Sequence, residues 1–206
     1  EPADIAKLTE ALGKKWLIQP GSHKAFATHV THQAVVQAIQ ELKREHRFDP
    51  KAITHVTIRG AHRILEDRHT VRDPTTVMGG QYSLPFTAAV ALTRDMSNPL
   101  VYDAAAVKDP LVRSLAKNME LIVDKSVHDL FPAEVEIVCG DKTYKKVTSA
   151  HKGSPHNPLT WADACEKFSR YTRTLVGEAQ AQAIIDAVAD LENQSDMARI
   201  ATLLAR

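Results

Sequence analysis

The sequence is poor in cysteine, in net charge and in long apolar runs, and each shortage argues against a class of protein. Its two cysteines, Cys139 and Cys165, lack the Cys-x-x-Cys spacing of redox and metal motifs, so we expect a reduced, cytoplasmic setting. The formal net charge is only +1, which argues against a nucleic-acid partner or an anionic membrane surface. No apolar run approaches the roughly 18–20 residues that span a bilayer.

The remaining composition is that of a globular protein. With 206 residues and 44% hydrophobic side chains, the chain can bury a sizeable core in one or two structural units. It begins at Glu1 rather than at methionine. We therefore expect either a domain of a longer protein or a processed product.

Hydrophobic spacing predicts strands in the middle of the chain and helices at its end. Residues 53–58 and 121–123 have the β-branched, apolar character of strands. Residues 133–139 and 143–148 alternate around a glycine-containing turn and predict a β-hairpin. After a linker rich in Gly, Pro and Ser, the expected helices are Trp161–Leu175, Ala179–Leu191 and Asp196–Leu204. The predicted fold class is α+β.

The stretch His23–His32 gathers one lysine and three histidines just ahead of a helix that should begin near Gln33. Val35, Ile39 and Leu42 give that helix a buried face. A helix start offers unpaired amides and a positive dipole end, which suit an anionic ligand. Lysine adds a formal charge, and histidine can exchange a proton near neutral pH.

Two interpretations of this stretch stay open on residue chemistry alone. It is either part of a catalytic site or a solvated polar helix start, since a chain with ten histidines clusters some of them by chance. A metal site at His29 and His32 is a third possibility. Zinc needs three or four ligands, and no third ligand lies at a recognisable spacing, so we expect no metal here.

A second polar patch precedes an apolar helix near residues 84–92. Paired glycines at 79 and 80 permit close backbone approach. Gln81, Tyr82 and Ser83 follow them, and either they line a site or they cap the helix.

Several separate blocks, taken together, carry a resemblance to a known family. They are Lys24-x-Phe26 leading to His32-Gln33-Ala34-Val35, Gly80-Gln81-Tyr82-Ser83-Leu84-Pro85-Phe86, Asp109-Pro110-Leu111-Val112, the Gly140-Asp141 hairpin, and Gly153-Ser154-Pro155-His156-Asn157-Pro158-Leu159-Thr160. In order and spacing these blocks resemble the C-terminal part of the MmgE/PrpD family. That family includes 2-methylcitrate dehydratase, cis-aconitate decarboxylase and an iminodisuccinate epimerase.

The resemblance implies an architecture and a set of partners. Residues 1–20 would connect from an N-terminal helical domain, residues 21–150 would form an α+β lid domain with a small antiparallel sheet and flanking helices, and residues 151–206 would return as helices belonging to the helical domain. The implied active site lies between the two domains and requires neither metal nor organic cofactor. The implied partners are a small di- or tricarboxylate, the helical domain of the same protein, and a second copy in a homodimer.

The resemblance also implies roles for individual residues. Lys24 and His29 match a lysine and a histidine that face the substrate in the decarboxylase branch, and His32 matches a histidine in the dehydratase-like branch. The implied chemistry is abstraction of a proton alpha to a carboxylate, as in a hydro-lyase, a decarboxylase or an isomerase. The alternative is a lid or interaction fragment that is inactive when isolated.

Three positions depart from the family pattern. Ala27 replaces a common proline, Gln37 replaces a common aspartate, and Phe86 stands where some members have a tyrosine. The missing hydroxyl at Phe86 argues against simple transfer of the decarboxylase mechanism and leaves dehydration and epimerisation open.

Overall fold

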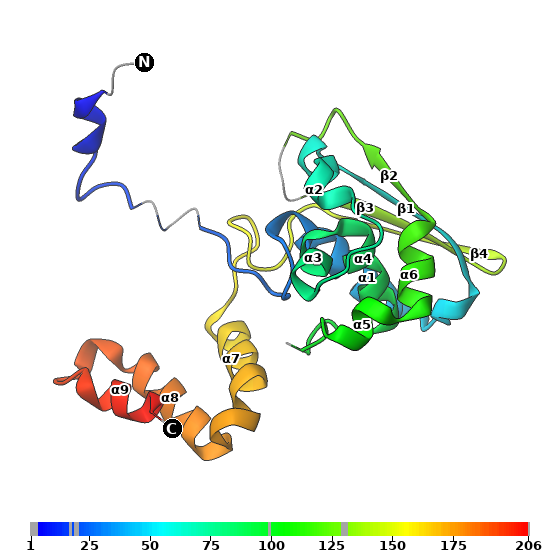
Figure 1. The fold of residues 1–206 in the computed structure, drawn as a ribbon. Helices are drawn as coiled ribbons and strands as arrows, with labels where there is room; N and C mark the ends of the chain where they lie inside the picture. The colour runs from blue at the N-terminus through cyan, green and yellow to red at the C-terminus, as the bar shows by residue number, and fades with distance from the viewer. Residues whose placement is uncertain (1–3, 17, 19–20, 99, 129–131, 206) are drawn as a thin grey trace.

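A computed structural model describes residues 4–16, 18, 21–98, 100–128 and 132–205. Its main body is a four-stranded sheet with helices packed on one face, and three C-terminal helices extend away from this body (Figure 1). The α+β class expected from the sequence is confirmed. The domain boundaries near residues 20 and 150 stay predictions.

The sheet has the strand order β2-β1-β3-β4. β1 (Ile53–Gly60) is antiparallel to β3 (Ala133–Cys139), and β3 forms the expected hairpin with β4 (Lys142–Thr148). β2 (Met119–Val123) is instead parallel to β1. The sheet is therefore mixed, which corrects the expected antiparallel sheet in this one pairing. The helical segment between β1 and β2 supplies the long crossover that a parallel pair needs.

The helices of the described chain are mostly short. In chain order they are η1 (Ile5–Leu8), η2 (Val30–His32), α1 (Gln33–His46), η3 (Pro50–Ala52), η4 (His62–Leu65), α2 (Asp67–Thr70), α3 (Val77–Tyr82), α4 (Leu84–Thr93), α5 (Ala104–Lys108), α6 (Pro110–Lys117), α7 (Trp161–Val176), α8 (Glu178–Ala189), η5 (Leu191–Asn193) and α9 (Ala198–Leu204). None of the helices in the described ranges is long and apolar enough to cross a bilayer.

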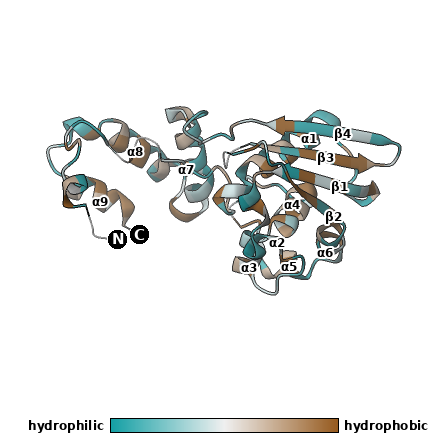
Figure 2. Ribbon diagram, turned by 90° about the horizontal axis from the view of Figure 1, so that it is seen from above, coloured by the Kyte–Doolittle hydropathy of each residue, from teal (hydrophilic) through white to brown (hydrophobic). Residues whose placement is uncertain are grey.

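The two faces of the sheet differ in chemistry (Figure 2). The inner face contributes the buried side chains of Val56, Ile58, Val135 and Ile137 to the core. On the outer face, Glu134 pairs with Arg59 at 3.3 Å and with Lys145 at 2.9 Å. Helices therefore cover only the apolar face, as binary patterning requires.

Helix α4 is the centre of the core. Every residue from Leu84 to Leu92 is buried, so no side of this helix faces water over that span. Ser83 caps its start by accepting a hydrogen bond from the Phe86 amide at 3.1 Å, and Pro85 lies in the first turn, where its missing N–H costs nothing. The small residues of α4 let α1 and α6 pack closely against it.

The expected linker at residues 151–158 is docked on the main body. The His23 amide donates to the Gly153 carbonyl at 2.7 Å, and the Lys152 amide donates to Gln37 Oε1 at 2.7 Å. His151, Gly153 and Ser154 are buried. This segment therefore anchors the chain immediately before Lys24.

Replacing Gly153 with alanine should destabilise the fold and release this anchor. Gly153 has φ +91°, and a Cβ there would lie 2.0 Å from the His23 carbonyl oxygen. We expect a loss of about 2 kcal/mol or more in the free energy of unfolding, measured by urea denaturation. Gly177 is the matched control, because its φ is +82° and nothing lies within 4 Å of the position that a Cβ would take there. Equal losses in the two alanine variants would contradict a specific role for Gly153.

Candidate active site

The loop that carries Lys24 and His29 is folded around one buried amide. Gln33 Oε1 accepts hydrogen bonds from the amides of Ala25 and Phe26, each at 3.0 Å, and its Nε2 donates to the Phe26 carbonyl at 3.1 Å. Longer contacts of Nε2 reach the carbonyls of Thr28 and His29. Gln33 is fully buried at the start of α1. The helix start thus sets the path of the loop.

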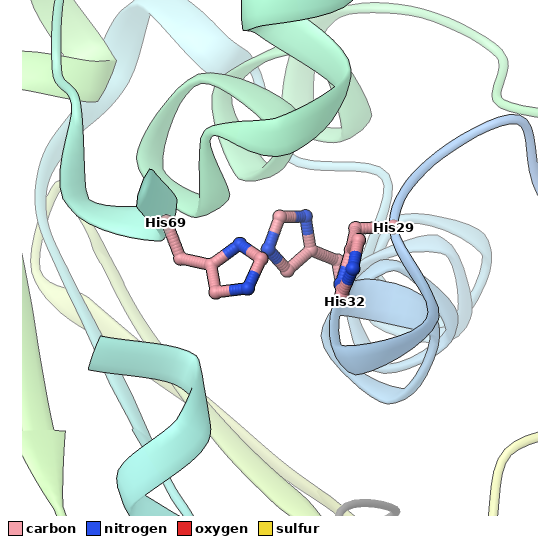
Figure 3. Close-up of side chains that lie close together, drawn as sticks. All are labelled: His29, His32 and His69. Carbon is pink, nitrogen blue, oxygen red and sulfur yellow. The ribbon is translucent and has the colours of Figure 1, made fainter. Parts of the chain in front are cut away.

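Three imidazoles meet beside this loop (Figure 3). His29 and His32 belong to η2 and its cap, and His69 comes from α2. The ring centroids are 4.5 Å apart for His29 and His69, 5.0 Å for His32 and His69, and 5.6 Å for His29 and His32. One ring nitrogen from each histidine lies within 4.8 Å of the other two. The sequence predicted the first pair and missed the third member.

The Nδ1 atom of each ring has a hydrogen-bond partner. His69 Nδ1 lies 3.0 Å from the Tyr82 carbonyl oxygen, which can only accept, so this nitrogen carries the proton. His32 Nδ1 lies 3.3 Å from a hydroxyl, Thr28 Oγ1, and His29 Nδ1 lies 2.9 Å from Thr31 Oγ1. The Nε2 atoms of His32 and His69 are buried without a hydrogen-bond partner in the described part of the chain.

Burial keeps His29 and His32 neutral. Loss of solvent is the main cause that lowers the pKa of His29 from 6.5 to about 4, and the charges of His69 and Lys24 lower it further. The pKa of His32 also lies well below its usual value, chiefly through burial. At neutral pH both rings are unprotonated, so His29 has a lone pair with which to accept a proton.

His29 faces a surface hollow of about 220 Å³. The hollow is lined by Lys24, Ala27, Thr28, His29, Gln81 and Tyr82. It therefore brings together four of the six residues proposed from the sequence. Lys24 is exposed there, and its carbonyl accepts a hydrogen bond from Lys167 of α7 at 2.6 Å.

The other two proposed residues, His32 and Ser83, do not line the hollow. His32 lies fully buried behind His29. Ser83 is also fully buried, and its hydroxyl both caps α4 and bonds to the Val71 carbonyl. Of the two roles left open for the patch before α4, capping describes Ser83. Gln81 and Tyr82 lie at the hollow, and the Tyr82 ring centroid is 5.1 Å from that of His29.

His69 is the site residue that sequence reasoning missed. It lies in a short segment, η4 and α2, whose sequence is charged and has no clear period. No spacing relates it to His29 or His32, because the crossover after β1 brings it to the cluster. A third histidine therefore accompanies the pair at 29 and 32, contrary to the expectation from spacing.

Phe86 lies in the core. Its side chain is fully buried, and its ring packs under Gly80, where an added Cβ would lie 2.8 Å from it. The residue is part of the core rather than of the hollow.

Comparison with known proteins agrees with the resemblance seen in the sequence blocks. A search of curated proteins found no match to this chain. The model of the MmgE/PrpD C-terminal domain matches residues 26–193, a range that includes the histidine cluster, the sheet, α4, α7 and α8. With most of its length matched, this chain belongs to the MmgE/PrpD family and contains its C-terminal domain.

Proposed function

We propose that this chain is the C-terminal part of a lyase of the 2-methylcitrate dehydratase type, which abstracts the proton alpha to a carboxylate in a small di- or tricarboxylate. One observation supports the proposal: Lys24 and His29, whose imidazole has a pKa lowered to about 4, both line the same hollow. The imidazole accepts a proton, and the ammonium group of Lys24 binds a carboxylate.

The reaction begins at His29. Its lone pair takes the alpha proton, and the electrons of the broken C–H bond move into the adjacent carboxylate, which becomes an enediolate. Lys24 stabilises that added negative charge. A pKa of about 4 makes His29 a weak base in the free protein. Bound carboxylates raise this pKa, because negative charge favours the imidazolium form.

The fate of the enediolate separates the members of this reaction class. Expulsion of a β-hydroxyl, with a proton from an acid, gives dehydration. Return of a proton to the opposite face gives epimerisation, the alternative function. Tyr82 is the candidate acid for either step, because its hydroxyl-bearing ring lies at the hollow beside His29.

Exchange of the alpha proton with solvent tests the proposal without a choice among these outcomes. The intact protein, which on this proposal includes the helical domain, is incubated in D₂O with a panel of di- and tricarboxylates. Loss of the alpha-proton signal is followed by NMR. We expect at least one acid to exchange. Failure of the whole panel to exchange would remove the proposed chemistry.

Replacing Lys24 with methionine should weaken substrate binding. A charge-assisted hydrogen bond lost from the complex lowers kcat/KM by about tenfold to 100-fold. Both KM and kcat should change, because Lys24 binds the carboxylate before the reaction and stabilises the charge added to it in the enediolate. The measurement is steady-state kinetics of the intact protein on the acid that exchanges. Lys142→Met, at an exposed position on β4, is the control, and an equal effect there would contradict the role of Lys24.

The proposed partners of this chain are the helical domain of the same protein and, in a homodimer, a second copy. An almost wholly apolar hollow of about 170 Å³ lies between α7 and α8, lined by Trp161, Ala164, Cys165, Phe168, Ile184, Ile185 and Val188. Such a surface favours an apolar helix as its partner. On this proposal the isolated chain is inactive, and turnover by this chain alone would contradict it.

A further inference from the structure

The histidine cluster contains buried polar atoms that its own fold leaves unsatisfied. His32 and His69 are fully buried, and within the described residues the Nε2 atom of each has no hydrogen-bond partner. A buried polar atom without a partner costs about 1–3 kcal/mol. Both atoms belong to rings 5.0 Å apart, so one bound group can satisfy both.

The Nδ1 atoms of the cluster have hydrogen-bond partners of the kind found in metal-binding histidines. A metal-ligating imidazole almost always donates its second N–H to a carbonyl, carboxylate or water. His69 Nδ1 donates to the Tyr82 carbonyl. The Nδ1 atoms of His32 and His29 face the hydroxyl oxygens of Thr28 and Thr31, which can accept. In His32 and His69 this leaves Nε2 for a ligand, and in His29 it does so when Nδ1 donates to Thr31 Oγ1.

We propose that Nε2 of His29, His32 and His69 together bind one divalent transition-metal ion of the Zn²⁺ class. Imidazole nitrogen suits Zn²⁺, Co²⁺ and Ni²⁺, and three protein ligands with one open position make a four-coordinate site. The rings converge from two elements (Figure 3). The open position lies on the side of His29, which lines the hollow.

Small movements complete the site. Ligand nitrogens at about 2.0–2.1 Å from zinc are roughly 3.4 Å apart in a tetrahedron, whereas one ring nitrogen of each histidine now lies within 4.8 Å of one from each of the other two. His29 is the least buried of the three and can turn toward the buried pair. Its Nδ1 then donates to Thr31 Oγ1 and gives up the long 3.4 Å bond from the Thr31 amide.

The surrounding charges favour a particular kind of fourth ligand on the metal. Lys24 and Arg68 place positive charge near His29, and Glu66 opposes it. Three neutral imidazoles leave the ion with its full double charge, so an anion is the favoured fourth ligand. Hydroxide or a carboxylate entering from the hollow fits that position.

Metal binding has a consequence that rests on the proposed function. The lone pair that holds the metal is the one with which His29 accepts a proton. The bound ion therefore inhibits turnover by the intact protein, and a chelator restores it.

Binding is tested first, with zinc chloride and the tag-free intact protein. Isothermal titration, and metal analysis after dialysis, should each find one Zn²⁺ ion bound per chain. Since changes in groups that merely orient a ligand cost about 10–100-fold in affinity, His29→Gln and His69→Gln should each weaken binding at least tenfold. His62→Gln, at an exposed histidine of η4, should bind as the parent does.

The outcomes separate the claims. Absence of zinc binding, or equal binding by the parent, His29→Gln and His69→Gln proteins, overturns the site. Circular dichroism checks that each variant is folded. If His69→Gln, at the more buried position, does not fold, the zinc affinity of His29→Gln alone decides whether the site exists. Zinc binding at the histidine cluster without loss of turnover overturns the proposed inhibition. A His29→Gln protein that loses zinc but keeps turnover overturns the proposed function and leaves the metal site standing.

Discussion

Replacing His29 with glutamine should lower turnover of the intact protein by about 100-fold or more, the usual contribution of a positioned general base. Glutamine keeps a polar side chain of similar reach but has no lone pair basic enough to accept the alpha proton. KM should change little, because Lys24 remains at the hollow to bind the carboxylate. His29 is only partly buried, so the variant should fold.

Two measurements make this prediction specific. Deuterium exchange at the alpha carbon should fall together with turnover, since both begin with the same proton transfer. His55→Gln serves as the control, because His55 lies on the outer face of the sheet beside Glu120, away from the hollow. Turnover and exchange at the parent rate in His29→Gln would exclude His29 as the base.

The features that the sequence predicted are those fixed by neighbouring residues. The hairpin of β3 and β4 follows from alternating side chains and a short turn around Gly140. Thr160 and Asp163 have the spacing of a capping box, and this box is present at the start of α7. In the same way, Asp109 caps α6 as its position before Pro110 predicts. Each of these structures depends on residues within a few positions of one another.

The features that the sequence did not reveal depend on contacts between distant segments. The parallel pairing of β1 with β2 requires the crossover to return the chain to one edge of the sheet, and no local pattern encodes that edge. His69 reaches His29 by the same crossover. The composition of the segment around Gly153 predicts a linker, whereas its close approach to His23 is a tertiary contact. Site membership therefore could not be derived from spacing alone.

Gln33 shows how one residue joins the predicted helix to the part of the site that was not predictable. The spacing of the apolar residues predicts its position at the start of α1, but its role depends on the hydrogen bonds of its side-chain amide. Oε1 and Nε2 bond the backbone on both sides of Phe26. The loop between Lys24 and His29 has no regular hydrogen-bonded structure of its own, so this amide replaces one.

Replacing Gln33 with leucine should therefore cost about 3 kcal/mol or more in the free energy of unfolding. The amides of Ala25 and Phe26 would lose their acceptor and the Phe26 carbonyl its donor, and each partly buried group left unpaired costs about 1–3 kcal/mol. Urea denaturation measures the loss. The same substitution at Gln40, whose amide makes one bond, to the Ala91 carbonyl, should cost about 1 kcal/mol.

Hydrogen exchange distinguishes a positioning role from a general loss of stability. Under conditions where Gln33→Leu remains folded, the amides of Ala25 and Phe26 should exchange much faster than in the parent, while those of β3 keep their protection. Turnover should fall with the loop, because Lys24 and His29 no longer hold one geometry and catalysis depends on such positioning. In Gln40→Leu the loop amides should stay protected. Uniform acceleration across the sheet and the loop would mean that Gln33 stabilises the whole fold without ordering the site.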